Sequence, residues 1–163
     1  MERRRSRLFE KIVSDINRSA VIDSTGTKPV DESKAEKHIV IAEDSPFLNK
    51  LIVNTLSEAG YKNIVSFDNG RDAWDYISGH KELKGDIREY VSCLISDIEM
   101  PQMDGHHLTK LIKDDDALKK IPVYLFSSLI NEQMRVKGNS VGADAQFSKP
   151  QIGALINYIN DHI

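Results

Sequence analysis

Short apolar runs that alternate with stretches of helical periodicity constrain the fold of this chain more than any other feature. From His38 onward, the runs cover residues 38–42, 64–65, 91–96, 121–126 and 145–148. Alternation of this kind is typical of β-α-β units, in which helices connect parallel strands and cover both faces of the sheet. The sequence therefore predicts an α/β fold with a doubly wound, five-stranded parallel sheet.

The stretches between the runs carry apolar residues at helical spacing. They predict helices near residues 47–59, 71–78, 108–112, 131–137 and 152–159. Ser45, Pro46 and Gly60 suit the cap, the first turn and the end of the first helix. We expect Trp74 to lie in the core. The charged stretch 80–90 is longer than a usual loop, which predicts a surface insertion to which we assign no role.

Polar side chains follow four of the runs, at the points where the predicted strands end. Glu43 and Asp44 follow the first strand, Asp97 the third, Ser127 the fourth and Lys149 the fifth. Taken singly, each has an ordinary interpretation as a helix cap, a loop charge or a turn hydroxyl. Because the carboxyl ends of parallel strands border one crevice, we expect these side chains to converge there. Carboxylates about 4 Å apart would repel by about 4 kcal/mol per pair at a dielectric of 20, so the cluster needs a cation, and Mg²⁺ suits such oxygen ligands.

Four segments resemble the signature segments of the two-component receiver domain, in the right order and at suitable spacing. They are residues 42–45, 97–105, 126–128 and 148–150. The resemblance covers roughly residues 37–163 and implies a flavodoxin-like, CheY-like receiver with strand order 2-1-3-4-5. It also implies a protein that accepts a phosphoryl group from a histidine kinase and is not a turnover enzyme.

The resemblance gives each residue of the cluster a role. Asp97 would be the nucleophile that forms an aspartyl phosphate. The direct ligands of Mg²⁺ would be Asp44, Asp97 and the backbone carbonyl of Glu99, and Glu43 would act through water. Phosphoryl binding and switching would involve Ser127, Ser128, Gln146 and Lys149. In this family the peptide bond between the lysine and the following proline is usually cis, so we predict a cis bond between Lys149 and Pro150.

Two positions depart from common receiver patterns. Many receivers carry an aromatic residue where Gln146 stands, and Phe147 cannot replace it because adjacent strand residues face opposite sides. The hypothesis is that phosphorylation moves the Ser127 loop and that an amide hydrogen bond provides the readout. An immobile loop in a beryllofluoride complex would count against it. Glu99, near the mouth of the site, would act electrostatically on a hydrolytic water. The dephosphorylation rate of Glu99→Asn would decide the direction of this effect, and an unchanged rate would exclude Glu99.

The closest resemblance within the family is to the receiver half of CheV-type chemotaxis coupling proteins. It rests on residues 96–101 and 142–145, and residues 8–17 resemble the stretch that links a CheV adaptor domain to its receiver. We therefore expect a short amphipathic helix over 1–17, a linker over 18–36 and a receiver over 37–163. The helix would either contact a partner surface or be the frayed end of an upstream adaptor domain. The implied partners are a CheA-type kinase and the chemoreceptor and adaptor complex.

Composition sets limits on other functions. The 163 residues carry a net charge of −3, which favours neither nucleic acid nor insertion into an anionic membrane. No apolar stretch suits a signal peptide or a membrane span, and Cys93 lies in an apolar run as a buried free thiol, so we expect a cytoplasmic location. The histidines, including adjacent His106 and His107, are scattered and predict no metal site.

Four other functions remain open at the level of the sequence. A stand-alone response regulator or phosphate sink would share the chemistry and differ in its partner. A degenerate receiver would be only a protein-binding module, although the complete acidic cluster argues against it. An aspartyl-phosphate phosphohydrolase usually carries a second Asp two residues after its nucleophile, where this chain has Glu99. DNA binding is the least favoured, because nothing that resembles an output domain follows Ile163.

Overall fold

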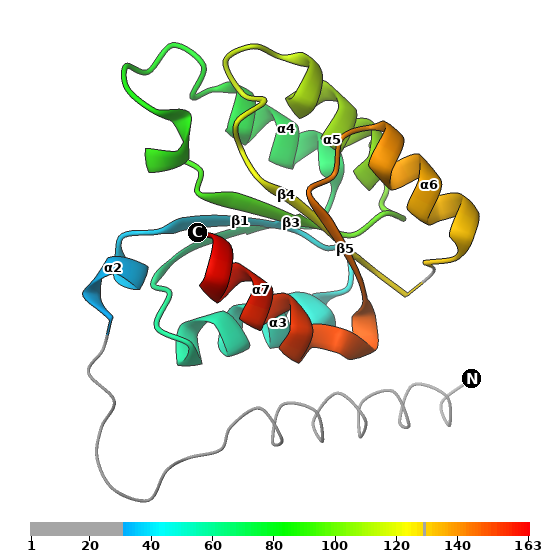
Figure 1. Cartoon of the computed structure of the whole chain (residues 1–163), viewed down its shortest axis with the longest axis horizontal. Coiled ribbons are helices and arrows are strands. Elements are labelled where there is room, and N and C mark those ends of the chain that lie inside the picture. The colour runs from blue at the N-terminus through cyan, green and yellow to red at the C-terminus, as the bar shows by residue number, and fades with distance from the viewer. Residues whose placement is uncertain (1–30, 129) are drawn as a thin grey trace, which may run out of the picture.

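A five-stranded parallel sheet lies between two layers of helices (Figure 1). The structure, a computed structural model, describes residues 31–128 and 130–163. The strands follow the order β2-β1-β3-β4-β5, which confirms the predicted fold class and strand order. Their bounds are β1 His38–Ala42, β2 Asn63–Phe67, β3 Cys93–Ser96, β4 Val123–Ser127 and β5 Ala145–Ser148.

The helices divide between the two faces of the sheet (Figure 1). One face is covered by α3 (Pro46–Glu58) and α7 (Ile152–His162). The other face is covered by α4 (Gly70–Ser78), α5 (Gly105–Asp114) and α6 (Glu132–Ser140). A short helix, α2 (Glu32–Ala35), precedes β1, and single 3₁₀ turns lie at Ile87–Glu89 and Lys149–Gln151.

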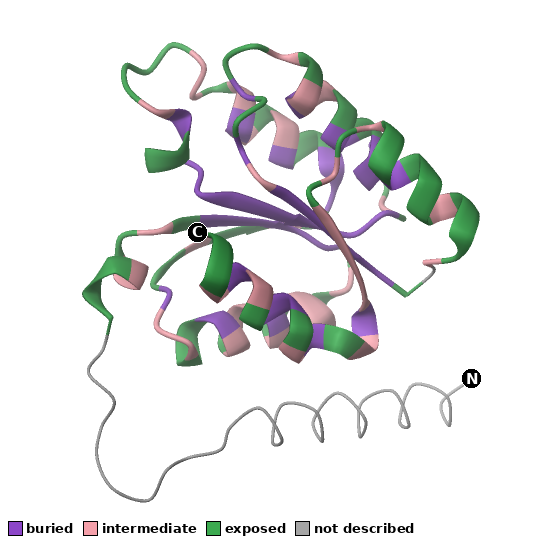
Figure 2. Cartoon of the chain, in the orientation of Figure 1, coloured by how far each residue is buried: buried purple, intermediate pink, exposed green. Residues whose placement is uncertain are grey.

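The central strands are buried on both faces. Val40 and Leu125 pack against the layer of α4 and α5, whereas Ile41 and Phe126 pack against α3 and α7. Every residue of β3 and β4 is buried (Figure 2), as expected for a parallel sheet that is covered by helices on both sides. Cys93 belongs to this core and is a buried free thiol, as predicted.

Two sequence-based expectations about the core need correction. Trp74 is only half-buried, because it lies at the edge of the core, where Lys81 Nζ is 5.1 Å from the centre of its ring. β3 begins at Cys93 and not at Val91, because its pairing with β1 starts where Cys93 lies opposite Ile39.

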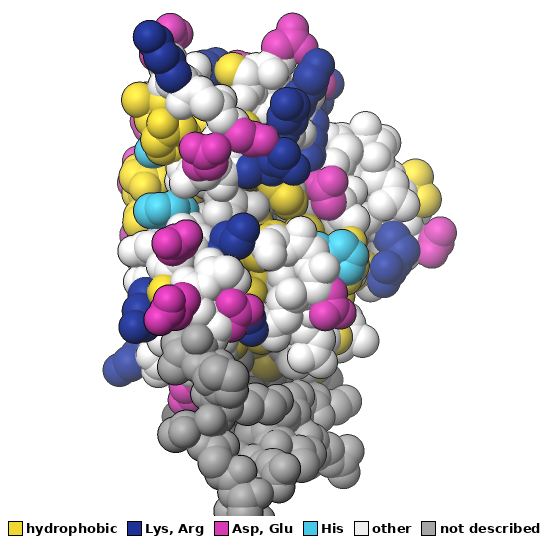
Figure 3. All heavy atoms as spheres, turned by 60° about the vertical axis from the view of Figure 1, so that its left-hand side comes forward, with side chains coloured by type: hydrophobic (Ala, Val, Ile, Leu, Met, Phe, Trp, Pro, Cys, Tyr) yellow, Lys and Arg dark blue, Asp and Glu magenta, His cyan; other side chains and the backbone are white. Residues whose placement is uncertain are grey.

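The surface features agree with a moderately charged protein. Residues 80–90 are mostly exposed, and buried Ile87 anchors this segment to the core. Acidic and basic side chains intermingle on the face shown in Figure 3.

Within the described ranges, no helix has the length and apolar character needed to cross a membrane. The helix predicted for residues 1–17 lies outside the described residues, as does most of the predicted linker, whose last residues contain α2.

Candidate functional site

The register of the sheet brings two of the predicted carboxylates side by side. Ala42 of β1 lies opposite Ser96 of β3, so Glu43 and Asp97 are the first residues beyond two neighbouring strands. The backbone of Asp97 continues the pairing, since its N–H donates to the carbonyl of Ala42 at 2.8 Å. The predicted convergence at the carboxyl end of the sheet is therefore present for these two residues.

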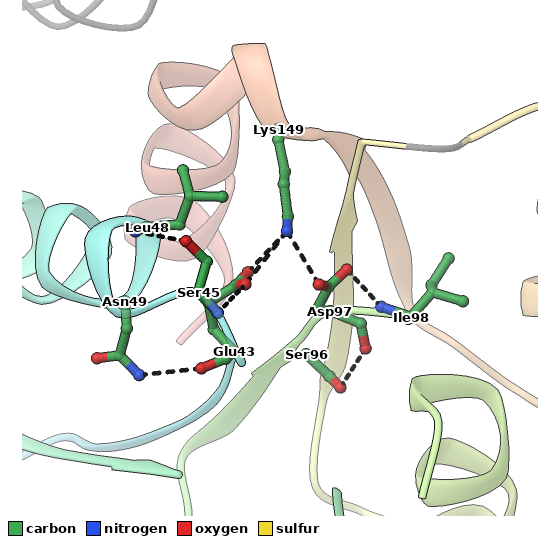
Figure 4. A network of polar contacts seen from close by, with 8 residues as sticks. All are labelled: Glu43, Ser45, Leu48, Asn49, Ser96, Asp97, Ile98 and Lys149. Carbon is green, nitrogen blue, oxygen red and sulfur yellow. Dashed lines mark hydrogen bonds and ion pairs between the residues drawn. The ribbon is translucent and has the colours of Figure 1, made fainter. Parts of the chain in front are cut away.

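Lys149 joins both carboxylates (Figure 4). Its Nζ lies 2.9 Å from Asp97 Oδ2 and 3.0 Å from Glu43 Oε2, and the side chain reaches them from the end of β5. All three residues are buried. Charge-assisted contacts of this length, shielded from water, fix the ammonium between the two strands.

A third carboxylate completes a cluster that could hold a metal ion. Glu43, Asp44 and Asp97 each offer an oxygen, and these oxygens lie within 4.8 Å of one another. Asp44 is exposed and gives the cluster contact with solvent. The only ligand atoms are hard oxygens, and one lysine cannot balance three carboxylates, so the donor set fits Mg²⁺.

The electrostatics of the site change the protonation of Glu43. Burial, together with the nearby charge of Asp97, raises the pKa of Glu43 to about 7, even though Lys149 acts in the opposite direction. Burial by itself would lower the pKa of Lys149, but the charges of Glu43 and Asp97 outweigh burial and raise that pKa. The lysine therefore stays charged, and Glu43 holds its proton more tightly than an ordinary glutamate does.

The loop after β3 holds Asp97 in one orientation. Asp97 Oδ1 accepts a hydrogen bond from the Ile98 N–H at 2.7 Å, and its carbonyl accepts one from Ser96 Oγ at 2.8 Å. Gly105 is required here, because a Cβ at this position would lie 2.0 Å from the Asp97 carbonyl oxygen. Asp104 caps α5 by accepting from the His107 N–H, so the loop is fixed at its far end as well.

Ser127, Ser128 and Glu99 lie at the same end of the sheet, at the end of β4 and after β3. Ser127 is buried at the end of β4, in register with Ser148, and Ser128 is exposed just beyond it. Glu99 is exposed and lines a shallow pocket with Asp44, Asp104 and Lys137. Sequence reasoning missed Lys137, because it lies in α6 and only the spatial position of that helix places it at this pocket.

Gln146 contacts α6. Its Nε2 donates to the carbonyl of Arg135 at 2.9 Å and to Asn139 Oδ1 at 3.0 Å. Its Oε1 is so close to Gly138 that a Cβ there would lie 2.3 Å away. The amide hydrogen bonds that the hypothesis requires are therefore present, and they connect β5 to α6; their role in a readout stays a prediction.

The prediction of a cis bond before Pro150 was wrong, since the described residues contain no cis peptide bond. Lys149–Gln151 form a 3₁₀ turn with Ser148 at its N-cap position, and Gln151 Oε1 accepts from the Ser148 N–H at 3.3 Å. Proline is tolerated at the start of such a turn because its missing N–H has no partner there. The ammonium of Lys149 reaches Asp97 and Glu43 from this trans backbone.

Known proteins resemble this chain in sequence and in fold. Chemotaxis protein CheV3 of Helicobacter pylori is 28% identical over 142 residues, which cover 86% of this chain and 45% of that protein. CheV2 of the same species is 32% identical over 147 residues, which cover 88% of this chain and 44% of that protein. The chain thus spans less than half the length of these relatives.

A solved structure agrees with this relationship. The receiver domain of a signal transduction histidine kinase from Syntrophus aciditrophicus superposes with a TM-score of 0.64 at 31% identity, over 77% of this chain and 88% of that one. The response regulator receiver domain model matches residues 39–160, which include β2 to β5, all of β1 except His38, and the acidic cluster. On this evidence the chain belongs to the receiver domain family of two-component response regulators.

Proposed function

We propose that the chain accepts a phosphoryl group on Asp97 in a reaction that requires Mg²⁺. The observation that carries the proposal is the position of Lys149 Nζ between Asp97 and Glu43, with three carboxylates around one point. Asp97 is buried and held by the Ile98 N–H and Lys149. We favour it as the nucleophile because Asp44 is exposed and the pKa of Glu43, raised to about 7, leaves that carboxyl partly protonated near neutral pH.

The reaction uses few groups. A carboxylate oxygen of Asp97 bonds to phosphorus while the bond from phosphorus to the donor nitrogen or oxygen breaks, and the donor atom keeps the electron pair. Lys149 would bind one phosphoryl oxygen, and Ser127 at the end of β4 another. Mg²⁺, held by Asp44, Asp97 and the Glu99 carbonyl with Glu43 acting through water, would neutralise charge on the phosphoryl group.

A chemotaxis role is the finer part of the proposal. It is supported by the similarity to CheV3 and CheV2, which extends over 86% and 88% of this chain. On this basis a CheA-type histidine kinase would be the phosphodonor, and phosphorylation would regulate the coupling of chemoreceptors to that kinase in the cytoplasm. A stand-alone regulator or phosphate sink is the alternative, because it needs the same acidic site and a different partner.

Intact mass spectrometry tests the phosphoacceptor proposal. After incubation with acetyl phosphate and Mg²⁺, followed by rapid acid quenching, we expect one phosphoryl adduct. Asp97→Asn and addition of EDTA should both abolish it. Asp114→Asn is a matched control, because Asp114 is an exposed aspartate of α5 that pairs with Lys110. An adduct of equal yield on Asp97→Asn would overturn the proposal.

The partner is tested separately. Transfer of labelled phosphate from a CheA-type kinase, compared with transfer from a kinase of an unrelated two-component pathway, distinguishes the chemotaxis role from the alternative. Faster transfer from the CheA-type kinase supports the role in coupling. Equal rates from both kinases would favour a general phosphate sink.

A further inference from the structure

Helix α2 is attached to the receiver by specific side-chain contacts. Lys34 Nζ donates to Asn160 Oδ1 in the last turn of α7 at 2.9 Å. The carbonyl of Ala35 accepts from Asn63 Nδ2, at the start of β2, at 2.7 Å. Two residues of a four-residue helix are thus connected to two separate elements of the domain.

The site that receives Lys34 is built for a cation. Besides Asn160, the ammonium lies 3.5 Å from the carbonyl of Ala59, which ends α3, and 5.5 Å from the centre of the Tyr61 ring. The carboxyl ends of two helices and an aromatic ring all favour a positive charge. The Lys34 stem lies against Gly60, with its Cδ 3.7 Å from where a Cβ would be.

Asn160, which accepts the hydrogen bond from Lys34, is held in place by a second contact. Asn160 Oδ1 accepts a second hydrogen bond, from the buried Tyr61 hydroxyl, at 2.9 Å. The same oxygen therefore connects α2, the turn after α3 and the end of α7. In Figure 1, α2 lies beside the C-terminal end of α7, in agreement with these contacts.

The position of α2 separates it from the acidic cluster. α2 leads into His38, the first residue of β1, whereas Glu43 follows the last residue of that strand. A strand of 5 residues spans about 16 Å, so α2 and Asp97 lie at opposite ends of the sheet.

We propose that α2 is a clasp that belongs to the receiver, with Lys34 as its principal contact. The clasp fixes the chain where it enters the domain, at the ends of α3 and α7. The clasp thereby holds Asp31, the first residue that the structure describes, at the end of the sheet opposite Asp97. The proposal does not depend on the reaction at Asp97.

Hydrogen exchange measured by mass spectrometry on the full chain tests the clasp. Lys34→Ala should speed exchange of the amides of residues 33–37 about tenfold, which corresponds to the loss of one charge-assisted hydrogen bond. Alanine is a strong helix former, so faster exchange would report lost docking and not lost helix propensity. Lys37→Ala is the matched control and should leave these amides unchanged.

A second pair of variants tests the other partner. Asn160→Ala should speed exchange of the same amides, whereas Asn157→Ala, an exposed residue of the same helix, should not. Both clasp variants should still react with acetyl phosphate at the wild-type rate. Unchanged exchange at residues 33–37 in Lys34→Ala and Asn160→Ala would overturn the proposal, as would equal effects in the two control variants.

Discussion

The two ends of the sheet hold their lysines in opposite ways. At the carboxyl end, Lys149 is buried with Glu43 and Asp97, and one positive charge faces two negative ones. At the amino end, half-buried Lys34 contacts neutral oxygens and an aromatic ring. Burying one ammonium with two carboxylates removes all three groups from water and costs stability, whereas Lys34 keeps part of its contact with solvent and carries a smaller part of this cost. We therefore expect buried charges to lower the stability of the fold at the carboxyl end of the sheet, where a cation and a phosphoryl group would bind.

The largest expected effect comes from removing each lysine charge in turn. Lys149→Met should lower the free energy of unfolding by about 3 kcal/mol at pH 7 without metal, because it leaves two carboxyls buried without their partner. Lys34→Met should cost about 1 kcal/mol, since its contacts are with neutral groups. Urea denaturation measures both. Equal losses in the free energy of unfolding for the two variants would show that the two lysines do not differ in this way.

The next effect is a dependence of stability on pH. The pKa of Glu43 rises from 4.5 in the unfolded chain to about 7 in the folded one, so the folded state holds the proton more tightly. The resulting stabilisation is complete below pH 4.5 and is lost as the pH rises through 7. It amounts to about 3 kcal/mol in full.

Urea denaturation at several pH values in EDTA tests whether the stability decreases as the pH rises. Relative to Glu43→Gln, the wild-type protein should lose stability between pH 5 and pH 8. Glu82→Gln, which alters an exposed glutamate, is the control and should follow the wild type. A difference between wild type and Glu43→Gln that stays constant with pH would show that Glu43 titrates normally.

A smaller effect is expected from Mg²⁺. At ten times its dissociation constant, the ion should stabilise the protein by about 1.4 kcal/mol, and more strongly at pH 8 than at pH 5 because it competes with the proton on Glu43. Asp44→Asn should weaken this stabilisation, whereas Asp114→Asn should keep it. Thermal unfolding with and without Mg²⁺ provides the measurement. Stabilisation that persists unchanged in Asp44→Asn would place the ion elsewhere.

The smallest effect concerns the contact between β5 and α6, which involves no ionic charge. Gly138→Ala should destabilise by about 1 kcal/mol, because the new Cβ displaces Gln146 from its two hydrogen bonds. In a Gln146→Ala background the same substitution should stabilise by up to about 1 kcal/mol, because alanine favours the helix. A double-mutant cycle measures this reversal of sign, and additive effects would contradict the contact.

Much of the fold could be predicted because its signals are local. The capping residue Ser45, the apolar run of β4 and the acidic residues after β1 and β3 all carry their meaning within a few positions. The convergence of Glu43 and Asp97 also followed, because the carboxyl ends of parallel strands must meet.

Other features depend on distant parts of the chain. The contact of Lys34 with Asn160 joins residues 126 positions apart, and nothing in a polar segment before the first strand indicates that it docks. The half-buried state of Trp74 depends on Lys81 and on the edge of the core. The peptide bond before Pro150 is trans, whereas the resemblance to the family was the only basis for predicting a cis bond.

The most direct test of the central claim is to locate the phosphoryl group at the carboxyl end of the sheet. The protein is treated with acetyl phosphate and Mg²⁺, the acyl phosphate is trapped by reduction with borohydride, and the digested peptides are sequenced by mass spectrometry. The account predicts modification of Asp97 alone, and none when EDTA replaces Mg²⁺. Modification of Asp44 or of a carboxylate outside the cluster, or labelling of Asp97 that does not require the metal, would contradict it.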